Sequence, residues 1–387
     1  MNDWQARIVD DITRIDRAQW DALVGAESPF LEWDWLASLE EAQCVQPERG
    51  WAPQHLTLES GGRLIAACPL YLKGHSEGEF VFDHEWAHAA QGAGIAYYPK
   101  LLVAVPFTPA NGMRFLTAPG QPRAELVRRL GEVLTQVCEQ NRLSSVHVNF
   151  CRADEVAVLA GLGFLERVGL QYHWQNPGYG SFEDYLGAFR SKRRTKIRHE
   201  RRAMEAQGVT IRALHGEAIP DRLVPIVYRL YQQHIDNLTW GRLYLNPRFF
   251  ELVAQRLRRN LCFIVAEQGG EVIAGTFNVQ KQGVFYGRYW GAFREVPFLH
   301  FNVCYYAAIE HCISQGLRRM EPGAGGDFKQ LRGFDPHPTH SMHFIADPAL
   351  RAAVARHLER ERARMGLVIE HLNAQSQLKL DARQGGP

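Results

Sequence analysis

The sequence lacks several features that would define its class at once. None of its seven cysteines forms a C-x-x-C pair, so it shows no zinc or redox motif of that kind. No stretch approaches the roughly 18 consecutive apolar residues of a membrane span, and the N-terminus has early acids in place of an apolar signal sequence. G-x-S-x-G, phosphate-loop and dinucleotide-binding glycine patterns are also missing, which argues against hydrolases, nucleotide hydrolases and dehydrogenases.

An excess of charge is missing too. With 44 Lys and Arg against 42 Asp and Glu, the formal net charge of +2 is too small to imply that the whole surface binds nucleic acid or membrane. The cysteines are scattered through apolar segments, as in a reducing compartment, so we expect a cytoplasmic protein. At 387 residues the chain is long enough for two hydrophobic cores, because a single core seldom grows past about 250–300 residues.

One segment occurs twice, at residues 59–67 and 267–275, with an offset of 267 − 59 = 208 residues. In both copies a Gly-Gly pair stands between two strand-like runs, which predicts a tight β-hairpin because glycine accepts the positive φ angles of such a turn. Two unrelated hairpins could share this common turn chemistry. The order of the surrounding elements decides between coincidence and duplication.

The predicted elements follow the same order around both hairpins: helix pair, hairpin, strand, helix, strand. In the first half the helices, strand, helix and strand are expected at 16–23, 33–42, 100–105, 123–139 and 145–150, and in the second half at 219–235, 247–257, 284–290, 302–315 and 319–321. This order resembles the topology of Gcn5-related N-acetyltransferases (GNAT), which favours duplication.

The expected fold class is therefore α/β (α+β), with tandem GNAT-like domains that each have a mixed central sheet flanked by helices. A turn-rich stretch at 175–180 places the boundary between an N-terminal domain, 1–176, and a C-terminal domain, 177–387. An apolar stripe from residue 350 onward predicts that the second domain ends in a long helix.

The densest group of chemically useful residues lies between 321 and 343. It begins at a predicted strand end and combines a glycine-rich turn with basic side chains, so that the backbone can approach a ligand whose phosphate or oxyanion the cations neutralise. The members we select as substrate- or phosphate-binding are Gly325, Gly326, Phe328, Arg332 and His343. A long surface loop that uses glycine for turns and charge for solubility is the alternative.

Three catalytic residues are expected in the second half: Lys329, Glu321 and Tyr289. Glu321 is the first choice of general base because it stands at a strand end beside the glycine-rich turn. Tyr289 could instead be a packing residue, and its neighbour Arg288 is taken as substrate-binding. The histidine pairs His340/His343 and His84/His88 could hold a metal only with further ligands, so we predict no metal site.

A concentrated basic run spans residues 190–202, with eight basic residues and one acid. It predicts a positive helix that contacts a phosphate-rich molecule: a tRNA backbone, the phosphates of CoA or an anionic headgroup. The residues assigned to this contact are Lys192, Arg193, Arg194 and Arg198. A solvated helix face is the alternative. The glycine loop Q/R-x-x-G-x-G/A that holds pyrophosphate in GNAT enzymes is missing after both hairpins, which weakens the case for an ordinary acetyl-CoA site.

The run 321–329, with Arg332-Gly333-Phe334 after it, resembles the signature of a bacterial FemAB-like family of GNAT-related predicted N-acyltransferases. Segments 28–31, 69–73 and 78–83 are similar to that family as well. The resemblance implies a relation to the Fem transferases, which carry two fused GNAT-like domains and pass an amino acid from aminoacyl-tRNA to a peptidoglycan precursor. It also implies that Phe328 and Lys329 lie at the acyl-transfer centre, where Lys329 stabilises the oxyanion or holds the terminal phosphate-ribose. The coiled-coil tRNA arm of those enzymes has no counterpart here.

We therefore expect an N-acyltransferase that moves an activated acyl or aminoacyl group to an amine, such as one on a cell-wall precursor. The donor could be acyl-CoA, acyl carrier protein or aminoacyl-tRNA, each acting as a co-substrate, and no tightly bound cofactor is expected. Expected partners are the amine acceptor and a tRNA, with peripheral membrane contact left open. The alternative is a non-catalytic protein that recognises a peptidoglycan-like ligand on a degenerate GNAT scaffold.

Overall fold

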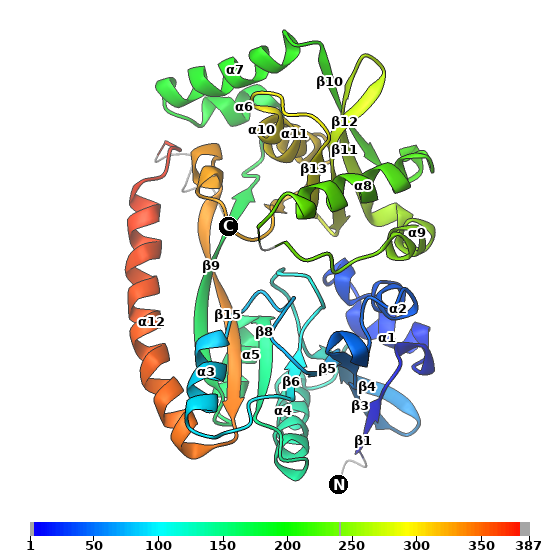
Figure 1. Ribbon diagram of the computed structural model, residues 1–387, viewed down its shortest axis with the longest axis vertical. Helices are drawn as coiled ribbons and strands as arrows, with labels where there is room; N and C mark the ends of the chain where they lie inside the picture. The colour runs from blue at the N-terminus through cyan, green and yellow to red at the C-terminus, as the bar shows by residue number, and fades with distance from the viewer. Residues whose placement is uncertain (1–3, 240, 380–387) are drawn as a thin grey trace. The chain divides into compact units, whose positions relative to one another are not determined.

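The structure is a computed structural model that describes residues 4–239 and 241–379 (Figure 1). The chain divides into two compact units, each made of two separate stretches. The first unit contains residues up to 170 together with 338–368, and the second contains 171–337 together with the residues from 369 onward. This division differs from the linear boundary expected after residue 176, because the chain crosses between the units within two of its strands.

The first unit has two sets of paired strands. One has the order β1-β3-β4-β7, and the strands of the other follow the order β15-β8-β6-β5-β2. The strands are β1 (Trp4–Val9), β2 (Trp51–Pro53), β3 (His55–Ser60), β4 (Arg63–Cys68), β5 (Leu70–Lys73), β6 (Lys100–Val103), β7 (Leu116–Thr117), β8 (Ser145–Cys151) and β15 (Asp335–Ile345). The helices are α1 (Arg17–Val24), α2 (Trp33–Glu41), α3 (His84–Gly92), α4 (Arg123–Gln140), α5 (Ala153–Ala160) and α12 (Pro348–Ala374).

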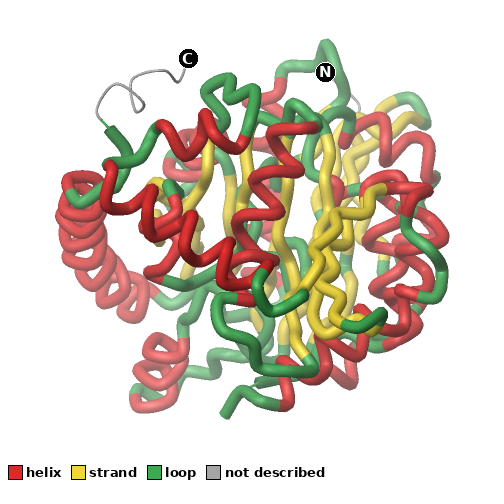
Figure 2. The backbone as a smooth tube through the Cα atoms, turned by 90° about the horizontal axis from the view of Figure 1, so that it is seen from above, coloured by secondary structure: helices red, strands yellow, loops and turns green. Residues whose placement is uncertain are grey.

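The second unit has one set of paired strands in the order β10-β11-β12-β13-β14-β9. They are β9 (Leu165–Gln175), β10 (Val209–His215), β11 (Leu261–Gln268), β12 (Glu271–Lys281), β13 (Val284–Ala292) and β14 (Arg319–Glu321). Its helices are α6 (Phe182–Gly187), α7 (Ser191–Glu205), α8 (Leu223–Asp236), α9 (Pro247–Arg256), α10 (Leu299–Phe301), a π-helix η6 (Asn302–Tyr306), α11 (Ala307–Ser314) and a 3-10 helix η7 (Asp327–Arg332). Helices lie on the outer sides of the strands (Figure 2).

The predicted fold class is confirmed, and so are both hairpins of the duplicated segment. Gly61 and Gly62 turn β3 into β4 with φ angles of 56° and 75°, and Gly269 and Gly270 turn β11 into β12 with φ angles of 60° and 84°. The expected long C-terminal helix is α12, but its residues up to Val368 belong to the first unit and not to the second domain, where the sequence placed them. The helix expected over 302–315 starts earlier, at Leu299, and contains the π-helix that the sequence pattern does not show.

Pro69 explains why the first unit has two sets of strands where the second has one. It separates β4 from β5, which pair with different neighbours. The repeat offset places Pro69 opposite Phe277 (277 − 69 = 208), where β12 stays continuous. Because proline has no N–H to donate, the hydrogen-bond ladder cannot pass through Pro69, and the strand breaks where its counterpart β12 runs on.

A network of charged side chains is buried in the first unit. Lys100 donates from Nζ to Ser76 Oγ at 2.8 Å, to Glu79 at 2.9 Å and to Asp83 at 2.5 Å. Tyr97 donates a further hydrogen bond of 2.6 Å to Asp83. The neighbouring carboxylates raise the pKa of Lys100 in spite of its burial, so the ammonium stays charged. Burial raises the pKa of Glu79 to about 7, whereas the charge of Lys100 lowers the pKa of Asp83 in spite of its burial, so Lys100 and Asp83 are the pair that is ionised at pH 7.

Two buried histidines, His147 on β8 and His343 on β15, face each other across paired strands. Their Nδ1 atoms lie 2.7 Å apart, and Ser145 and Ser341 bond the remaining ring nitrogens at 2.8 and 2.9 Å. Burial lowers the pKa of His147 to about 3, assisted by the charge of Lys100, and lowers that of His343 well below its ordinary value. Both rings are neutral at pH 7.

These histidines predict that the protein loses stability in acid. Between pH 6.5 and about 3 the unfolded chain binds a proton on His147 that the folded chain excludes, so the free energy of unfolding falls as the pH falls. His343 acts in the same direction, and each group contributes a slope of up to about 1.4 kcal/mol per pH unit. Urea unfolding at pH 7, 6 and 5 measures this slope. The variant His147→Asn should make the slope shallower; an unchanged slope would contradict the assignment.

Candidate functional site

Strands β13 and β14 separate at one point in the second unit. They run parallel through the pairs Val284–Arg319, Phe285–Met320 and Tyr286–Glu321, where β14 ends while β13 continues to Ala292. Gly287 comes directly after the last pair, and a Cβ atom there would lie 3.2 Å from Pro322 Cα. The backbones therefore touch at Gly287 and then diverge. Open α/β sheets bind ligands beyond the carboxyl ends of such strands.

The other neighbour of β14 stops pairing at the same level. Strand β9 pairs with β14 at Gln175–Arg319 and Trp174–Met320, and no further. His173 therefore stands beside Glu321, with Nε2 3.8 Å from Oε2 of the carboxylate. Arg319 forms an ion pair with Glu321 at 2.8 Å. Glu321, the expected general base, is thus buried at the point of divergence and already engaged by a cation.

Tyr289 and Arg288 lie on the part of β13 that continues past the divergence. The Tyr289 ring packs on Tyr231 of α8, with centroids 4.6 Å apart, and on Phe277 of β12 at 6.0 Å. The Arg288 guanidinium lies 5.2 Å from the centroid of the Tyr289 ring. Both side chains are half-buried in an aromatic cluster. Their catalytic and substrate-binding roles stay predictions.

The helix after β13 begins with an irregular turn. Phe298, at its start, has a φ of 67°, and residues Asn302–Tyr306 form the π-helix, a local widening that is frequent at functional sites. His300 lies in the first turn, with its ring 4.9 Å from that of Trp290 and 5.4 Å from that of Tyr305. Burial and the nearby charge of Arg332 lower the pKa of His300 to about 4, so this imidazole is neutral at pH 7.

The glycine-rich segment after β14 folds over the side chain of Lys329. Gly323, Gly325 and Gly326 have φ angles of 86°, 70° and 89°, which only glycine adopts easily. Lys329 is 3% exposed, and its Nζ donates to Gly323 O at 2.6 Å and to Ala324 O at 3.2 Å. Burial lowers the pKa of Lys329 to about 8, so in most molecules its side chain is still a charged ammonium at pH 7. The structure thus holds a cation inside the predicted loop.

Phe328, the residue before Lys329, points outward. Its side chain is 55% exposed, and its ring lies 5.6 Å from that of Phe301. An exposed aromatic ring next to a buried ammonium offers an apolar surface beside a positive charge. The acyl chain or the nucleobase of a donor could pack on such a ring. The predicted substrate contact of Phe328 remains a prediction.

Arg332 is buried, and both terminal nitrogens of its guanidinium have partners within the second unit. Its guanidinium pairs with Glu200 at 2.9 Å and lies 3.5 Å from the centroid of the Phe301 ring. Tyr306 donates a hydrogen bond to the same Glu200 carboxylate, and Tyr185 donates one of 2.9 Å to the carbonyl of Arg332. Arg332 therefore ties η7 to α7. The structure thus gives Arg332 an internal partner, and its predicted contact with a substrate phosphate stays a prediction.

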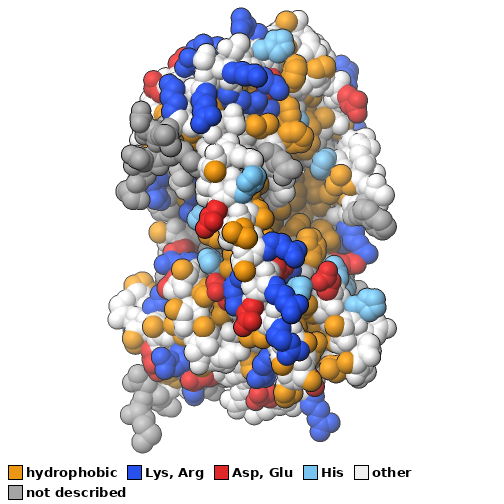
Figure 3. Space-filling view, turned by 90° about the vertical axis from the view of Figure 1, so that its left-hand side faces the viewer, with side chains coloured by type: hydrophobic (Ala, Val, Ile, Leu, Met, Phe, Trp, Pro, Cys, Tyr) orange, Lys and Arg blue, Asp and Glu red, His pale blue; other side chains and the backbone are white. Residues whose placement is uncertain are grey.

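The basic run forms helix α7, and its side chains divide by exposure. Arg193 is buried and donates to Leu331 O at 2.6 Å, while Arg198 is exposed and pairs with Glu183 at 2.5 Å. Lys192 is exposed and Arg194 is half-buried. Lys and Arg side chains gather on the face of the unit that carries α7 (Figure 3). The exposed basic residues of this helix and its N-cap are Arg190, Lys192, Lys196, Arg198 and Arg202.

The remaining predicted residues are His343, Gly325 and Gly326. His343 belongs to the first unit, in the buried pair with His147. Gly325 and Gly326 shape the turn over Lys329. Among the described residues, no group of three or more His, Cys, Asp or Glu side chains is arranged to hold a metal ion.

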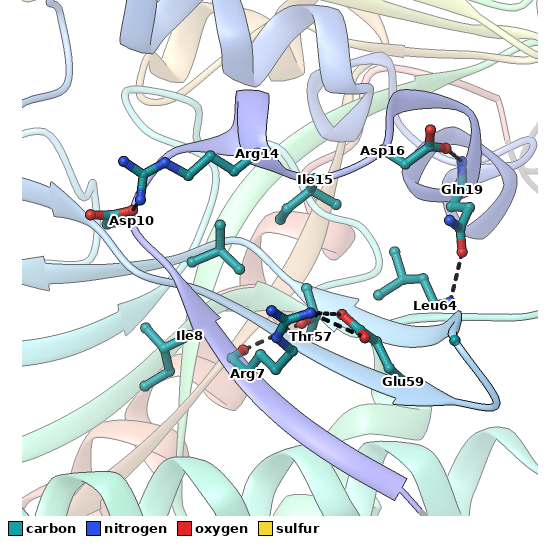
Figure 4. A pocket seen from close by; sticks show the side chains of 12 residues that line it. Arg7, Ile8, Asp10, Arg14, Ile15, Asp16, Gln19, Thr57, Glu59 and Leu64 are labelled. Carbon is teal, nitrogen blue, oxygen red and sulfur yellow. Dashed lines mark hydrogen bonds and ion pairs between the residues drawn. The ribbon is translucent and has the colours of Figure 1, made fainter.

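A separate cavity of about 310 Å³ lies in the first unit between β1, the β3–β4 hairpin and the start of α1 (Figure 4). Its charged side chains already have partners: Arg7 pairs with Glu59 at 3.3 Å and Arg14 with Asp10 at 2.8 Å. Asp16 accepts a hydrogen bond from the backbone of Gln19 at the start of α1. We assign no function to this cavity, because each of these charged side chains is engaged within the protein.

Two mixed α/β units, with diverging parallel strands in the second, define a protein of the tandem GNAT-like class. The chain belongs to the FemAB-like family, described as peptidoglycan biosynthesis/recognition, whose sequence model matches residues 11–380. No curated protein matches the sequence.

Solved structures show the same fold at low sequence identity. The crystal structure of FemX has a TM-score of 0.54 and 10% identity, with 88% of this chain and 98% of that one covered. L-PGS from Bacillus licheniformis gives 0.50 and 10%, covering 89% and 97%, and a conserved protein of unknown function from Bacteroides thetaiotaomicron gives 0.53 and 11%, covering 88% and 100%. At such identities the likeness shows the fold alone. Within the described residues, no helix has the length and apolar character needed to cross a bilayer.

The sequence did not indicate two residues of this cluster. His173 lies in a strand-like run before the expected boundary, which places it in the first half of the sequence. In the structure β9 pairs with β14, and His173 belongs to the second unit. Glu200 is the single acid in the basic run, and this could have drawn attention to it. A lone carboxylate among eight cations suggests a partner for a basic side chain, and in the structure that partner is Arg332.

The Arg332–Glu200 pair predicts a large loss of stability when one partner is removed. Arg332→Met leaves the Glu200 carboxylate buried without its cation, so we expect the free energy of unfolding to fall by about 3–5 kcal/mol. Arg198→Met is the matched control, since it breaks an exposed pair with Glu183 and should cost less than about 1 kcal/mol. Urea denaturation measures both, and equal small costs would show that the buried pair is dispensable.

Proposed function

We propose that the second unit transfers an activated acyl or aminoacyl group to an amine. The observation that carries the proposal is the buried ammonium of Lys329, held by Gly323 O and Ala324 O just past the divergence of β13 and β14. Acyl transfer needs a positive group where the carbonyl oxygen becomes negative, and such a group acts most strongly when it is fixed and shielded from water.

Lys329 has the hydrogen-bonding capacity for this role. An ammonium has three N–H donors, and two are accounted for by the carbonyls of Gly323 and Ala324. We propose that the third donates to the carbonyl oxygen of the donor. The two carbonyls also fix the direction of the ammonium, so little reorganisation is needed during the reaction.

The donor we propose is rich in phosphate. The exposed cations of α7, which include Lys192 and Lys196, form an attractive surface for phosphates. Aminoacyl-tRNA, acyl-CoA and acyl carrier protein all fit this chemistry, and the family resemblance favours aminoacyl-tRNA. These donors act as co-substrates, so no tightly bound cofactor is needed.

The acceptor we propose is the amine of a cell-wall precursor in the cytoplasm. The description of the family as peptidoglycan biosynthesis/recognition supports this choice. A protein that binds such a precursor without turnover is the second candidate, favoured by one observation: the segment after β13 lacks the Q/R-x-x-G-x-G/A loop. The two candidates differ in whether Lys329 affects turnover or affinity.

The variant Lys329→Met distinguishes an acyltransferase from a protein that binds the precursor without turnover. For an acyltransferase we expect kcat to fall by about 10²–10³-fold, as when one oxyanion donor is removed, while the melting temperature is kept. Lys379→Met is the control, because Lys379 is an exposed lysine whose ammonium donates to a backbone carbonyl, that of Gly187, as the ammonium of Lys329 does to two others. A thermal-shift panel with CoA, palmitoyl-CoA and deacylated tRNA identifies the donor, since a ligand at 100 times its Kd stabilises by about 2.7 kcal/mol.

The pH dependence offers a second readout of the same lysine. Lys329 acts as a cation, which is present below its pKa of about 8 and is lost above it. The rate should therefore fall as the pH rises through about 8, and Lys329→Arg should move this limb to higher pH because guanidinium stays charged. A binder without turnover would show an altered Kd in Lys329→Met and no acyl transfer by the wild type.

A further inference from the structure

His173 has an unusual environment for a histidine that is 3% exposed. Neither of its ring nitrogens has a hydrogen-bond partner among the described residues. The ring stacks on His337 at 4.2 Å and places Nε2 3.8 Å from Glu321, at the level where β14 leaves both of its neighbours. Buried polar groups are nearly always satisfied, so a bare imidazole at this position points to a missing substrate group.

Burial and the positive groups around His173 keep it neutral. Three elements supply its titratable neighbours: β14 brings Arg319 and Glu321, the first residues of β15 bring His337, and η7 brings Lys329. Burial, followed by the effects of His337, Arg319 and Lys329, lowers its pKa well below the ordinary value. A neutral imidazole has a lone pair that can receive a proton, whereas the Glu321 carboxylate is held by Arg319 at 2.8 Å.

We infer that His173 accepts the proton of the attacking amine at the divergence of β13 and β14, with Glu321 orienting its ring. This inference rests on the proposed acyl transfer and adds a catalytic residue to it. Glu321 then becomes a positioning residue, in place of the base that the sequence suggested. His173 lies before the boundary expected after residue 176, and Glu321 and Lys329 lie after it. The site therefore draws on both of the halves that the sequence suggested.

The step balances as follows. The neutral amine nitrogen forms a bond to the carbonyl carbon of the donor, and the carbonyl oxygen takes the negative charge beside Lys329. The adduct nitrogen, now positively charged and acidic, gives its proton to His173. The bond from the carbonyl carbon to the leaving oxygen or sulfur breaks, and the leaving group takes that proton from the imidazolium. Such proton transfers typically contribute about 10²–10⁴-fold to the rate.

The test compares His173→Asn with the wild type, using alanyl-tRNA, acetyl-CoA and palmitoyl-CoA as donors. Ethanolamine, a basic amine, and hydroxylamine, a weakly basic one, serve as acceptors. We expect kcat with ethanolamine to fall by at least about 100-fold at unchanged KM, and kcat with hydroxylamine to fall by less than about tenfold, because its more acidic adduct loses a proton to water. His311→Asn is the control, since His311 is another buried histidine of the unit and bonds Gln280 at 2.8 Å.

Equal losses with the two amines, or a changed KM with unchanged kcat, would reduce His173 to a structural role. A wild type that transfers no acyl group to either amine refutes the proposed function itself, whereas wild-type transfer that His173→Asn retains refutes only the role of His173. Nitrogen NMR of the imidazoles adds a readout independent of turnover: the signals lost in His173→Asn should remain those of a neutral ring from pH 7 to pH 5. A titration midpoint near 6.5 would overturn the inference.

Discussion

The divergence of β13 from β14 is the constraint on which the second unit depends. The pairing of the two strands ends at Tyr286–Glu321, and just beyond it Gly287 approaches Pro322 so closely that a Cβ would lie 3.2 Å from backbone. The next residue of β13, Arg288, forms a bulge, because the pairing with β12 skips it. The glycine-rich turn can leave β14 because the backbone at Gly323 reaches a φ of 86°. Glu321 is the last residue of β14, Lys329 follows in η7 after the glycine-rich turn, and His173 lies on β9, the other neighbour of β14.

The buried pair of Arg332 and Glu200 gives the turn a second anchor. It links η7, which carries Lys329, to α7, which carries the exposed cations. A donor whose phosphates lie on α7 would therefore meet an acyl-transfer centre on a segment held by the same helix. Fixed geometry of this kind lowers the entropic cost of bringing the donor carbonyl to its site.

The sequence was informative wherever a local rule decides the structure. Gly-Gly turns predicted both hairpins, apolar periodicity predicted the helices that flank them, and the glycines before Lys329 predicted a tight turn. Long-range pairing was out of reach. Nothing local in β9 or β15 shows that each strand crosses from one unit to the other, so the boundary was placed along the chain and His173 was overlooked.

Partners of buried charges were equally hidden, because a basic side chain that binds a phosphate and one that binds Glu200 look alike in sequence. The π-helix likewise left no trace in the apolar pattern.

The central claim is that the acyl carbonyl binds where β13 and β14 diverge. A crystal structure with a non-reactive acyl-CoA or aminoacyl-tRNA analogue tests this most directly. The account predicts density for the carbonyl oxygen within hydrogen-bond distance of Lys329 Nζ; a carbonyl bound elsewhere, for example in the cavity beside Arg7 and Glu59, would contradict it.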